Sequence, residues 1–319
     1  MNPKLRFNLD KIKKHSYGTL YYVVRYLILL AFVYVLAYPF AFMAMNALKS
    51  TGDWLDPTVE WVPKHISLKS VHLSMIVLKY WSSLFSTMIN GIVAALLSFI
   101  SCSFVAYGLA RFNFRGKRFL MVVMVLCILI PDTMIMIPSY DNFRHLDFLG
   151  ILGWLSKLTG VELRPSILNT PLVFWLPALF ATGLKNGFFI YIYLQFFKGL
   201  PKELEEAAWI DGAGPWKTFL RIVLPSSGAA AVTVLVFSVV WYYNDYYQAQ
   251  IYLSDHFPLS VMLANLKTLL TGDVIGKQTF AIGLLILTCS FICILPLLMF
   301  FMFMQRRFVK SIATCGIVG

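Results

Sequence analysis

The sequence predicts an all-α integral membrane protein with six transmembrane helices, and three observations support this. The 319-residue chain is 59% hydrophobic, has only 13% charged residues and shows a mean hydropathy of +0.73. A soluble domain of this size contains about 25% charged residues, so too little polar surface is present to cover a globule in water. Long uncharged segments recur, and they lack the alternation of apolar and polar residues that marks a β-barrel strand.

Six segments are long and apolar enough to be membrane spans, because a helix needs about 20 residues to cross a hydrocarbon core of roughly 30 Å. Four are free of charged residues, and the other two contain a single charge each, at Asp132 and at Lys185. In chain order the predicted spans are residues 26–48, 80–110, 119–140, 165–197, 222–244 and 278–305. The fourth is expected to kink at its helix breakers, which are Pro171, Pro177, Gly183 and Gly187.

The distribution of Lys and Arg places both termini in the cytoplasm under the positive-inside rule. With that orientation the inside segments hold 17 of the 27 basic residues and the outside segments hold nine. We therefore predict one membrane domain over residues 1–319. Its parts are a cytoplasmic segment 1–25, a six-helix bundle 26–305 and a cytoplasmic tail 306–319. Residues 1–25 are interpreted as preceding a start-transfer anchor, since the following apolar stretch is too long for a signal peptide.

Several classes of function find no support in the sequence. The net charge of +12 is explained by topology and by attraction to anionic lipid, and no basic-aromatic patch points to nucleic acid. No phosphate-binding Gly-x-x-x-x-Gly-Lys-Ser/Thr loop is present. The five histidines lie outside the predicted spans and form no metal-ligand or Ser/His/Asp pattern, while four of the five cysteines fall inside spans. We expect no metal site, no catalytic residues and no cofactor bound by this chain.

The most informative segment is the inside loop between the fourth and fifth spans, residues 198–225. Local sequence predicts a helix, a turn and a second helix. Pro201 suits a first helical turn, and the acidic residues after it complement the positive end of the helix dipole. Gly212 and Gly214 can end the first helix, and Pro215 can begin the second. Leu204, Ala207 and Ala208 are expected to share one shallow face that another protein's cleft could receive.

This loop resembles the EAA loop of ABC importer permeases, whose pattern is Glu-Ala-Ala, three residues, Gly, nine residues, Ile, one residue and Leu-Pro. The matching residues are Glu206, Ala207, Ala208, Gly212, Ile222, Leu224 and Pro225. The resemblance covers most of the chain and is strongest to the MalG-type permeases of carbohydrate importers. Further similarity lies in residues 106–112, in Leu200-Pro201, in Ile210-Asp211-Gly212-Ala213 and in the tail from Arg307.

The resemblance implies a type I importer (MetI-like) permease fold in a bacterial cytoplasmic membrane. It also implies a second, homologous permease subunit, two cytoplasmic ATPases that bind ATP and magnesium, and an extracytoplasmic solute-binding protein. In that family the loop forms a coupling helix that docks on the ATPase. The docking residues would be Glu203, Leu204, Glu206, Ala207, Ala208, Asp211 and Gly212. An amphipathic helix lying on lipid is the alternative, but such a helix prefers Lys and Arg on its polar face.

Ionisable residues within predicted spans are candidates for the solute pathway or for a partner interface. Lys185, with Asn186 beside it, is expected either to meet an acidic or hydroxyl-rich solute or to pair with a carboxylate of the partner permease. Asp132 is expected to make a structural hydrogen bond near the outer part of the third span.

The end of the fifth span is a second candidate for contact with the solute. Trp241, Asn244, Asp245 and Gln248 are expected to fall on one helical face, where a ring and polar groups would suit a sugar. The alternative is an aromatic belt at the membrane surface. Members of the family often have Trp, Asn and an acid in succession here, whereas two tyrosines separate Trp241 from Asn244 in this chain.

The sequence thus predicts a permease subunit that forms half of a carbohydrate pathway, with an oligosaccharide as the expected cargo. The identity of the cargo stays open. The same machine could carry a glycerol phosphate, an anionic sugar or a polyamine, and a self-sufficient channel or secondary transporter is a further alternative.

Overall fold

The computed structural model describes residues 3–147, 150–271 and 282–315, and within them the side chains of 21–147, 150–270 and 282–306. The described residues form helices joined by turns, and one isolated antiparallel bridge pairs Lys49 with Ile66. The fold class predicted from sequence is therefore confirmed. The chain divides into two compact units, Met1–Ser74 with Lys277–Ile292, and Met75–Gly276 with Cys293–Gly319. The single membrane domain remains a prediction.

The first unit contains the long helix α1 (Pro3–Ala47), the short helix α2 (Thr51–Leu55), most of α3 (Lys69–Val77) and the first turns of α17 (Ile282–Cys315). From Tyr21 to Tyr38, α1 exposes apolar side chains on all sides. Such a helix is stable only in apolar surroundings, as expected of a membrane span.

A tight loop follows α2 in this unit and is fixed by two charged side chains. Asp53 accepts a hydrogen bond from the backbone N–H of His65 at 2.8 Å, and this bond lowers the pKa of the carboxyl group. The buried Lys49 donates from its Nζ to the carbonyl oxygens of Val59 at 3.0 Å and Glu60 at 2.8 Å.

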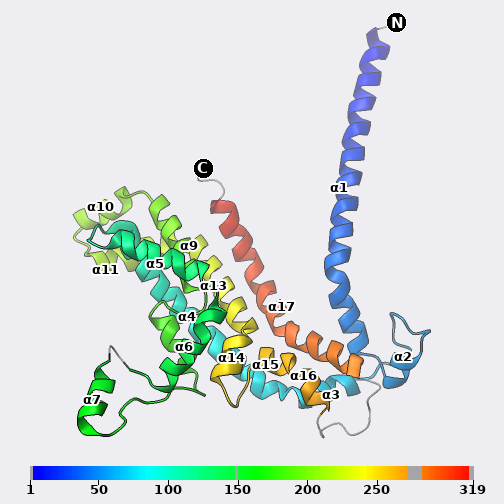
Figure 1. The fold of residues 1–319 in the computed structure, drawn as a ribbon. Helices are drawn as coiled ribbons and strands as arrows, with labels where there is room; N and C mark the ends of the chain where they lie inside the picture. Colours follow the sequence, from blue (N-terminus) through cyan, green and yellow to red (C-terminus); the bar gives the residue numbers. More distant parts are fainter. Residues whose placement is uncertain (1–2, 148–149, 272–281, 316–319) are drawn as a thin grey trace. The chain divides into compact units, whose positions relative to one another are not determined.

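The second unit is built around α4 (Tyr80–Arg111), which packs against α8 (Leu172–Leu179), α9 (Asn186–Gly199), α13 (Gly228–Asn244) and α15 (Leu259–Ala264). Figure 1 shows α4, α9 and α13 side by side. One stripe of α4 repeats a small residue every fourth position and is fully buried, and it consists of Ala94, Ser98, Cys102 and Ala106. Small residues allow membrane helices to approach closely. The large rings of Phe189, Tyr193 and Phe197 on α9 fill the space beside α4.

Three of the predicted spans are broken rather than continuous. The third divides into α5 (Lys117–Leu129) and α6 (Asp132–Arg144), which meet at 105° next to Pro131. The fourth divides into α8 and α9, as its helix breakers predict, with Phe180–Lys185 outside regular helix. The fifth begins at Gly228 instead of 222, because Pro225 cannot donate a backbone hydrogen bond and the chain bends by 78° before α13.

By length and composition, the described residues contain three helices able to cross a membrane, or up to five if each bent pair counts as one span. The count of six and the orientation of the termini therefore remain predictions. Residues 278–281 of the sixth predicted span and residues 316–319 of the tail lie outside the described part of the chain.

Shorter helices complete the second unit. One of them is α7 (Ile151–Thr159), which lies between Gly150 and Gly160, both in left-handed conformation. The others are α10 (Glu203–Ile210), α11 (Pro215–Thr218), the π-helix η1 (Phe219–Val223), α12 (Leu224–Ser226), α14 (Tyr247–Tyr252) and α16 (Leu266–Thr271).

The contact between α5 and α9 depends on a glycine. A Cβ atom at Gly187 would lie 3.1 Å from Cβ of Cys127 and 3.2 Å from the carbonyl oxygen of Met124. We expect Gly187→Val to lower the stability of the detergent-purified chain by about 1–3 kcal/mol, because the two helices must separate. Thermal unfolding followed by circular dichroism measures this loss.

Gly108→Ala in α4 is the matched control, since no atom lies within 4 Å of the place that a Cβ at this position would occupy. Alanine favours a helix by about 1 kcal/mol over glycine, so this variant should unfold at the same temperature as the parent or higher. Equal losses from both substitutions would contradict the close α5–α9 contact.

Candidate functional site

The loop between α9 and α13 folds as the helix, turn and second helix that its sequence predicts. The first helix, α10, ends in a Schellman turn with Gly212 at φ +77°. In this turn the N–H of Gly212 donates to the carbonyl of Trp209 at 3.0 Å, and that of Ala213 donates to Ala208 at 2.9 Å. Pro215 begins α11, as predicted. The expectation for Pro201 is wrong, because it precedes α10, whose N-cap is Lys202.

The exposed face of α10 differs from the predicted one. Most of the predicted docking residues are exposed, namely Glu203, Leu204, Glu206, Ala207, Asp211 and Gly212. Ala208, however, is buried, and so is Glu205, three residues before it. Ala208 therefore packs inside the chain, and the exposed part of the predicted face consists of Leu204 and Ala207. The reason is that Glu205 has a partner in the protein interior, and residues three apart lie on the same side of a helix.

That partner is Arg111, the last residue of α4. Its Nε lies 2.5 Å from Oε1 of Glu205, and the two side chains are only 8% and 5% exposed. The hydroxyl of Tyr107, one turn earlier on α4, donates to Oε2 of Glu205 at 3.1 Å. Arg111 also donates from Nη2 to the carbonyl oxygen of Leu200 at 2.9 Å. A single guanidinium thus binds the segment that enters α10 and the helix itself.

Aromatic rings pack against Tyr107, which is hydrogen-bonded to this buried ion pair, and against its neighbours on α4. The ring of Tyr107 lies 4.9 Å from that of Phe219 in η1 and 6.1 Å from that of Phe197 in α9. Phe104 on α4 contacts Trp216 of α11 with ring centroids 5.2 Å apart. In such surroundings, removing one partner of an ion pair is costly because the other charge stays buried alone. Sequence reasoning missed Arg111 and Glu205 as a pair, since their contact joins positions that are distant along the chain.

The outer side of the same loop carries an exposed apolar surface. Its members are Leu204, Trp209, Ile210, Trp216 and Leu220, and Ile210 is 87% exposed. The acidic residues Glu203, Glu206 and Asp211 are exposed beside them. Exposed apolar side chains bordered by polar residues are typical of protein–protein interaction sites. We call these eight exposed residues, five apolar and three acidic, the outer surface of the loop.

Lys185 and Asp132 lie at the breaks of the fourth and third predicted spans and pair with each other. Nζ of Lys185 is 2.5 Å from Oδ2 of Asp132. The structure thus provides a carboxylate partner within the same chain, where sequence suggested a solute or the other permease. Asp132 makes a structural contact, as expected, though with a cation. Asn186 is buried and faces the carbonyl oxygen of Ala178 at 3.5 Å.

A small cavity of about 50 Å³ lies beside Asp132 and is lined by a mixture of polar and aromatic side chains. They include Asp132, Ser139, Phe143, Thr182, Tyr242 and Gln248. This volume admits a few water molecules, and it is too small for a saccharide in this conformation.

The residues predicted at the end of the fifth span do not form one helical face. Helix α13 ends at Asn244, and Asp245 has an extended conformation as its C-cap. Gln248 lies in the next helix, α14, and its backbone N–H donates to Oδ1 of Asp245 at 3.3 Å. Trp241 packs against Phe188, Phe189 and Phe237, with ring centroids 5.5–5.7 Å apart. Contact of Trp241, Asn244 or Asp245 with a solute remains a prediction.

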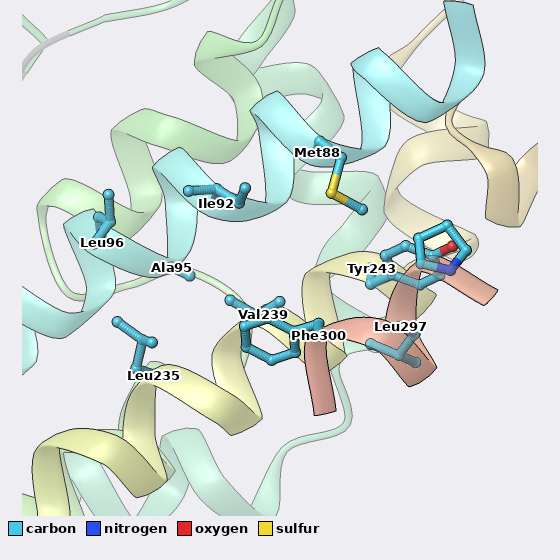
Figure 2. Close-up of a pocket in the computed structure, with 10 residues that line it drawn as sticks. Met88, Ile92, Ala95, Leu96, Leu235, Val239, Tyr243, Leu297 and Phe300 are labelled. Atoms are coloured by element: carbon cyan, nitrogen blue, oxygen red, sulfur yellow. The ribbon is translucent and has the colours of Figure 1, made fainter. Parts of the chain in front are cut away.

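An apolar cavity of about 180 Å³ lies between α4, α13 and α17 (Figure 2). Its lining includes Met88, Ile92, Leu235, Val239 and Phe300. No charged side chain lines it, so it does not suit a polar solute. Among the described residues, no group of three His, Cys, Asp or Glu side chains is close enough to hold a metal ion.

Comparison with known proteins identifies the family that this chain resembles. Residues 103–314 match the model of the family described as "Binding-protein-dependent transport system inner membrane component". The chain is 26% identical to the "Probable ABC transporter permease protein YurM" of Bacillus subtilis, over 91% of this chain and 87% of that protein. It is also 26% identical to the "Melibiose/raffinose/stachyose import permease protein MelC" of the same bacterium, over 93% and 97% of the two chains.

The fold is shared with a solved structure. A chain of "a bacterial ABC transporter involved in the import of the acidic polysaccharide alginate" superposes with a TM-score of 0.69, over 90% of this chain and 96% of that one. The identity between the two sequences is 18%, so this likeness shows the fold alone.

The Lys185–Asp132 pair gives a prediction. Lys185→Gln or Asp132→Asn alone should lower stability in detergent by roughly 1 kcal/mol, because each leaves a partly buried charge without its partner. The double variant should recover most of this loss. Thermal unfolding of the three purified variants measures the coupling. The control is Asp141→Asn, which removes an exposed carboxylate from the same helix. Losses that simply add in the double variant would show that the two side chains do not interact.

Proposed function

Because the chain belongs to the family of binding-protein-dependent transport system inner membrane components, we propose that it forms half of the pathway of an ATP-driven importer. The importer would lie in a bacterial cytoplasmic membrane and contain a second, homologous permease subunit. Two separate ATPase subunits would supply the energy, with ATP and magnesium bound to them. An extracytoplasmic binding protein would deliver the solute.

The observation that carries this proposal is the outer surface of the loop. The loop has the spacing of the EAA pattern, and α10 presents exposed Leu204, Ala207 and Ile210 together with exposed acidic residues. A partner that buries this surface gains apolar contact. Charge-assisted hydrogen bonds to Glu206 would add orientation. Both features suit docking on a folded protein better than on an anionic lipid surface, which repels acidic groups.

The proposed transport cycle is alternating access. ATP binding would draw the ATPases together and carry the two permeases' loops with them. The helices attached to each loop would then reorient and expose the pathway to the opposite side, and hydrolysis would reset the machine. Broken helices such as α5–α6 and α8–α9 are compatible with a pathway, because non-helical backbone at membrane depth is tolerated where protein or water surrounds it.

We propose a carbohydrate, and an oligosaccharide in particular, as the cargo. The names of MelC and of the "Arabinooligosaccharides transport system permease protein AraQ" of Halalkalibacterium halodurans support this assignment. The main alternative is an anionic cargo. The Lys185–Asp132 pair weighs against an anionic cargo at this position, because the cation is already neutralised within the chain.

Docking is tested at the most exposed apolar residue of the loop. Ile210→Asp should abolish co-purification of the cognate ATPase and abolish ATP-driven uptake, because a new charge would be buried at the interface. Glu206→Lys, which reverses a charge on the same surface, should act in the same direction. Val62→Asp, at a 69% exposed position in the loop of the first unit, is the matched control. ATPase retention and normal uptake in Ile210→Asp would refute docking at this surface.

A second test uses the turn that ends α10. Gly212 has φ +77° and no neighbouring atom, so Gly212→Ala adds backbone strain of about 1 kcal/mol without a steric clash. Gly214 has φ −74° and equally open surroundings, so Gly214→Ala should be tolerated. We expect uptake to fall several-fold in the first variant only. Identical uptake by the two variants in membrane vesicles would show that the shape of this turn does not matter.

A further inference from the structure

The attachment of α10 to the rest of the molecule is concentrated in a few polar contacts. Within this eight-residue helix only Glu205 and Ala208 are buried. Isolated helices of this length are unstable in water, so α10 depends on its contacts with α4, α11 and η1. The strongest of these is the buried pair of Glu205 with Arg111.

We infer that Arg111, Glu205 and Tyr107 form the joint through which movement of α10 reaches the transmembrane helices. This inference rests on the proposed function. It assigns a role to three positioning residues that do not belong to the outer surface of the loop. The outer surface would bind the ATPase, and the joint would carry the resulting displacement into α4.

The geometry favours α4 as the element that receives the movement. Arg111 and Tyr107 are both on its last turns, and α4 is in contact with α8, α9, α13 and α15. The buried small-residue stripe keeps α4 close to its neighbours, so a displacement of its end is passed to packed helices rather than absorbed by loose side chains. Through its ring, Tyr107 also contacts Phe197 of α9 and Phe219 of η1.

Arg111 holds the loop at two points, one before α10 and one within it. Its guanidinium contacts the carbonyl oxygen of Leu200 before α10 and the carboxylate of Glu205 in the first turn of the helix. The guanidinium is planar and carries several donors, so it reaches both oxygens at once, whereas a lysine would offer a single point charge. Because the pair is almost fully buried, thermal motion and salt should open it rarely.

The first experiment measures attachment in the purified chain without any partner. Hydrogen–deuterium exchange of the α10 amides should rise at least about tenfold in Glu205→Gln and in Arg111→Gln, because each leaves a buried group unpaired. The reciprocal exchange Arg111→Glu with Glu205→Arg should restore a large part of the protection. Arg115→Gln is the control, since Arg115 is exposed and lies between α4 and α5. Tyr107→Phe, which removes one hydrogen bond, should have a smaller effect.

The second experiment measures transmission in the assembled importer. Glu205→Gln should keep the ATPase bound but reduce ATP-driven uptake at least about tenfold, and the reciprocal exchange should recover uptake in part. Retention of the ATPase separates loss of transmission from loss of folding, and recovery on charge exchange shows that the two side chains act through each other. Protection and uptake like those of the parent in Glu205→Gln would overturn the joint, as would a reciprocal exchange that restores neither.

The two experiments separate this inference from the proposed function. If the parent chain binds no ATPase, while exchange still rises in Glu205→Gln and falls again on charge exchange, the attachment stands. The proposed function, and with it the transmission of movement, then fails. If the ATPase binds and uptake proceeds but α10 exchanges equally in all variants, the joint fails and the proposed function stands.

Discussion

The ion pair between Arg111 and Glu205 is the contact on which the arrangement of the loop depends. It places the inner side of α10 against the end of α4 and thereby turns Ile210, Leu204 and Ala207 outward. Two charges removed from water are stable only when well paired, and here the hydroxyl of Tyr107 and the carbonyl of Leu200 complete the pairing. The contact on the buried side of α10 thus determines which of its residues are exposed.

A similar principle operates at the helix breaks. Where Pro131 interrupts the third predicted span and residues 180–185 interrupt the fourth, Asp132 and Lys185 meet as an ion pair. Interrupted helices leave backbone groups unpaired and give polar side chains access to one another. The small residues of α4 have the opposite effect, since they permit close packing where the helix is continuous. Continuous helices provide the packed core of the second unit, and the breaks of the third and fourth predicted spans carry the Lys185–Asp132 ion pair.

Sequence predicted the helical membrane fold, the apolar segments and the helix–turn–helix of the loop, because these follow from composition and from local signals such as Gly212 and Pro215. It did not predict which side of α10 is buried. That depends on Arg111, 94 positions before Glu205 in the chain, and periodicity carries no information about such contacts. The predicted helical face that contains Trp241 and Asn244 is wrong for a related reason. Helix α13 ends at Asn244, and no proline or glycine at this point of the sequence indicates the end of the helix.

The most direct test of docking through α10 is site-specific photo-crosslinking in intact cells, with a photoreactive amino acid at position 207 on the exposed side of this helix. The expected product is a covalent adduct with a nucleotide-binding polypeptide, formed on the cytoplasmic side of the membrane. Adducts with lipid only, or labelling of position 207 by a membrane-impermeant reagent added outside the cell, would contradict docking on an ATPase.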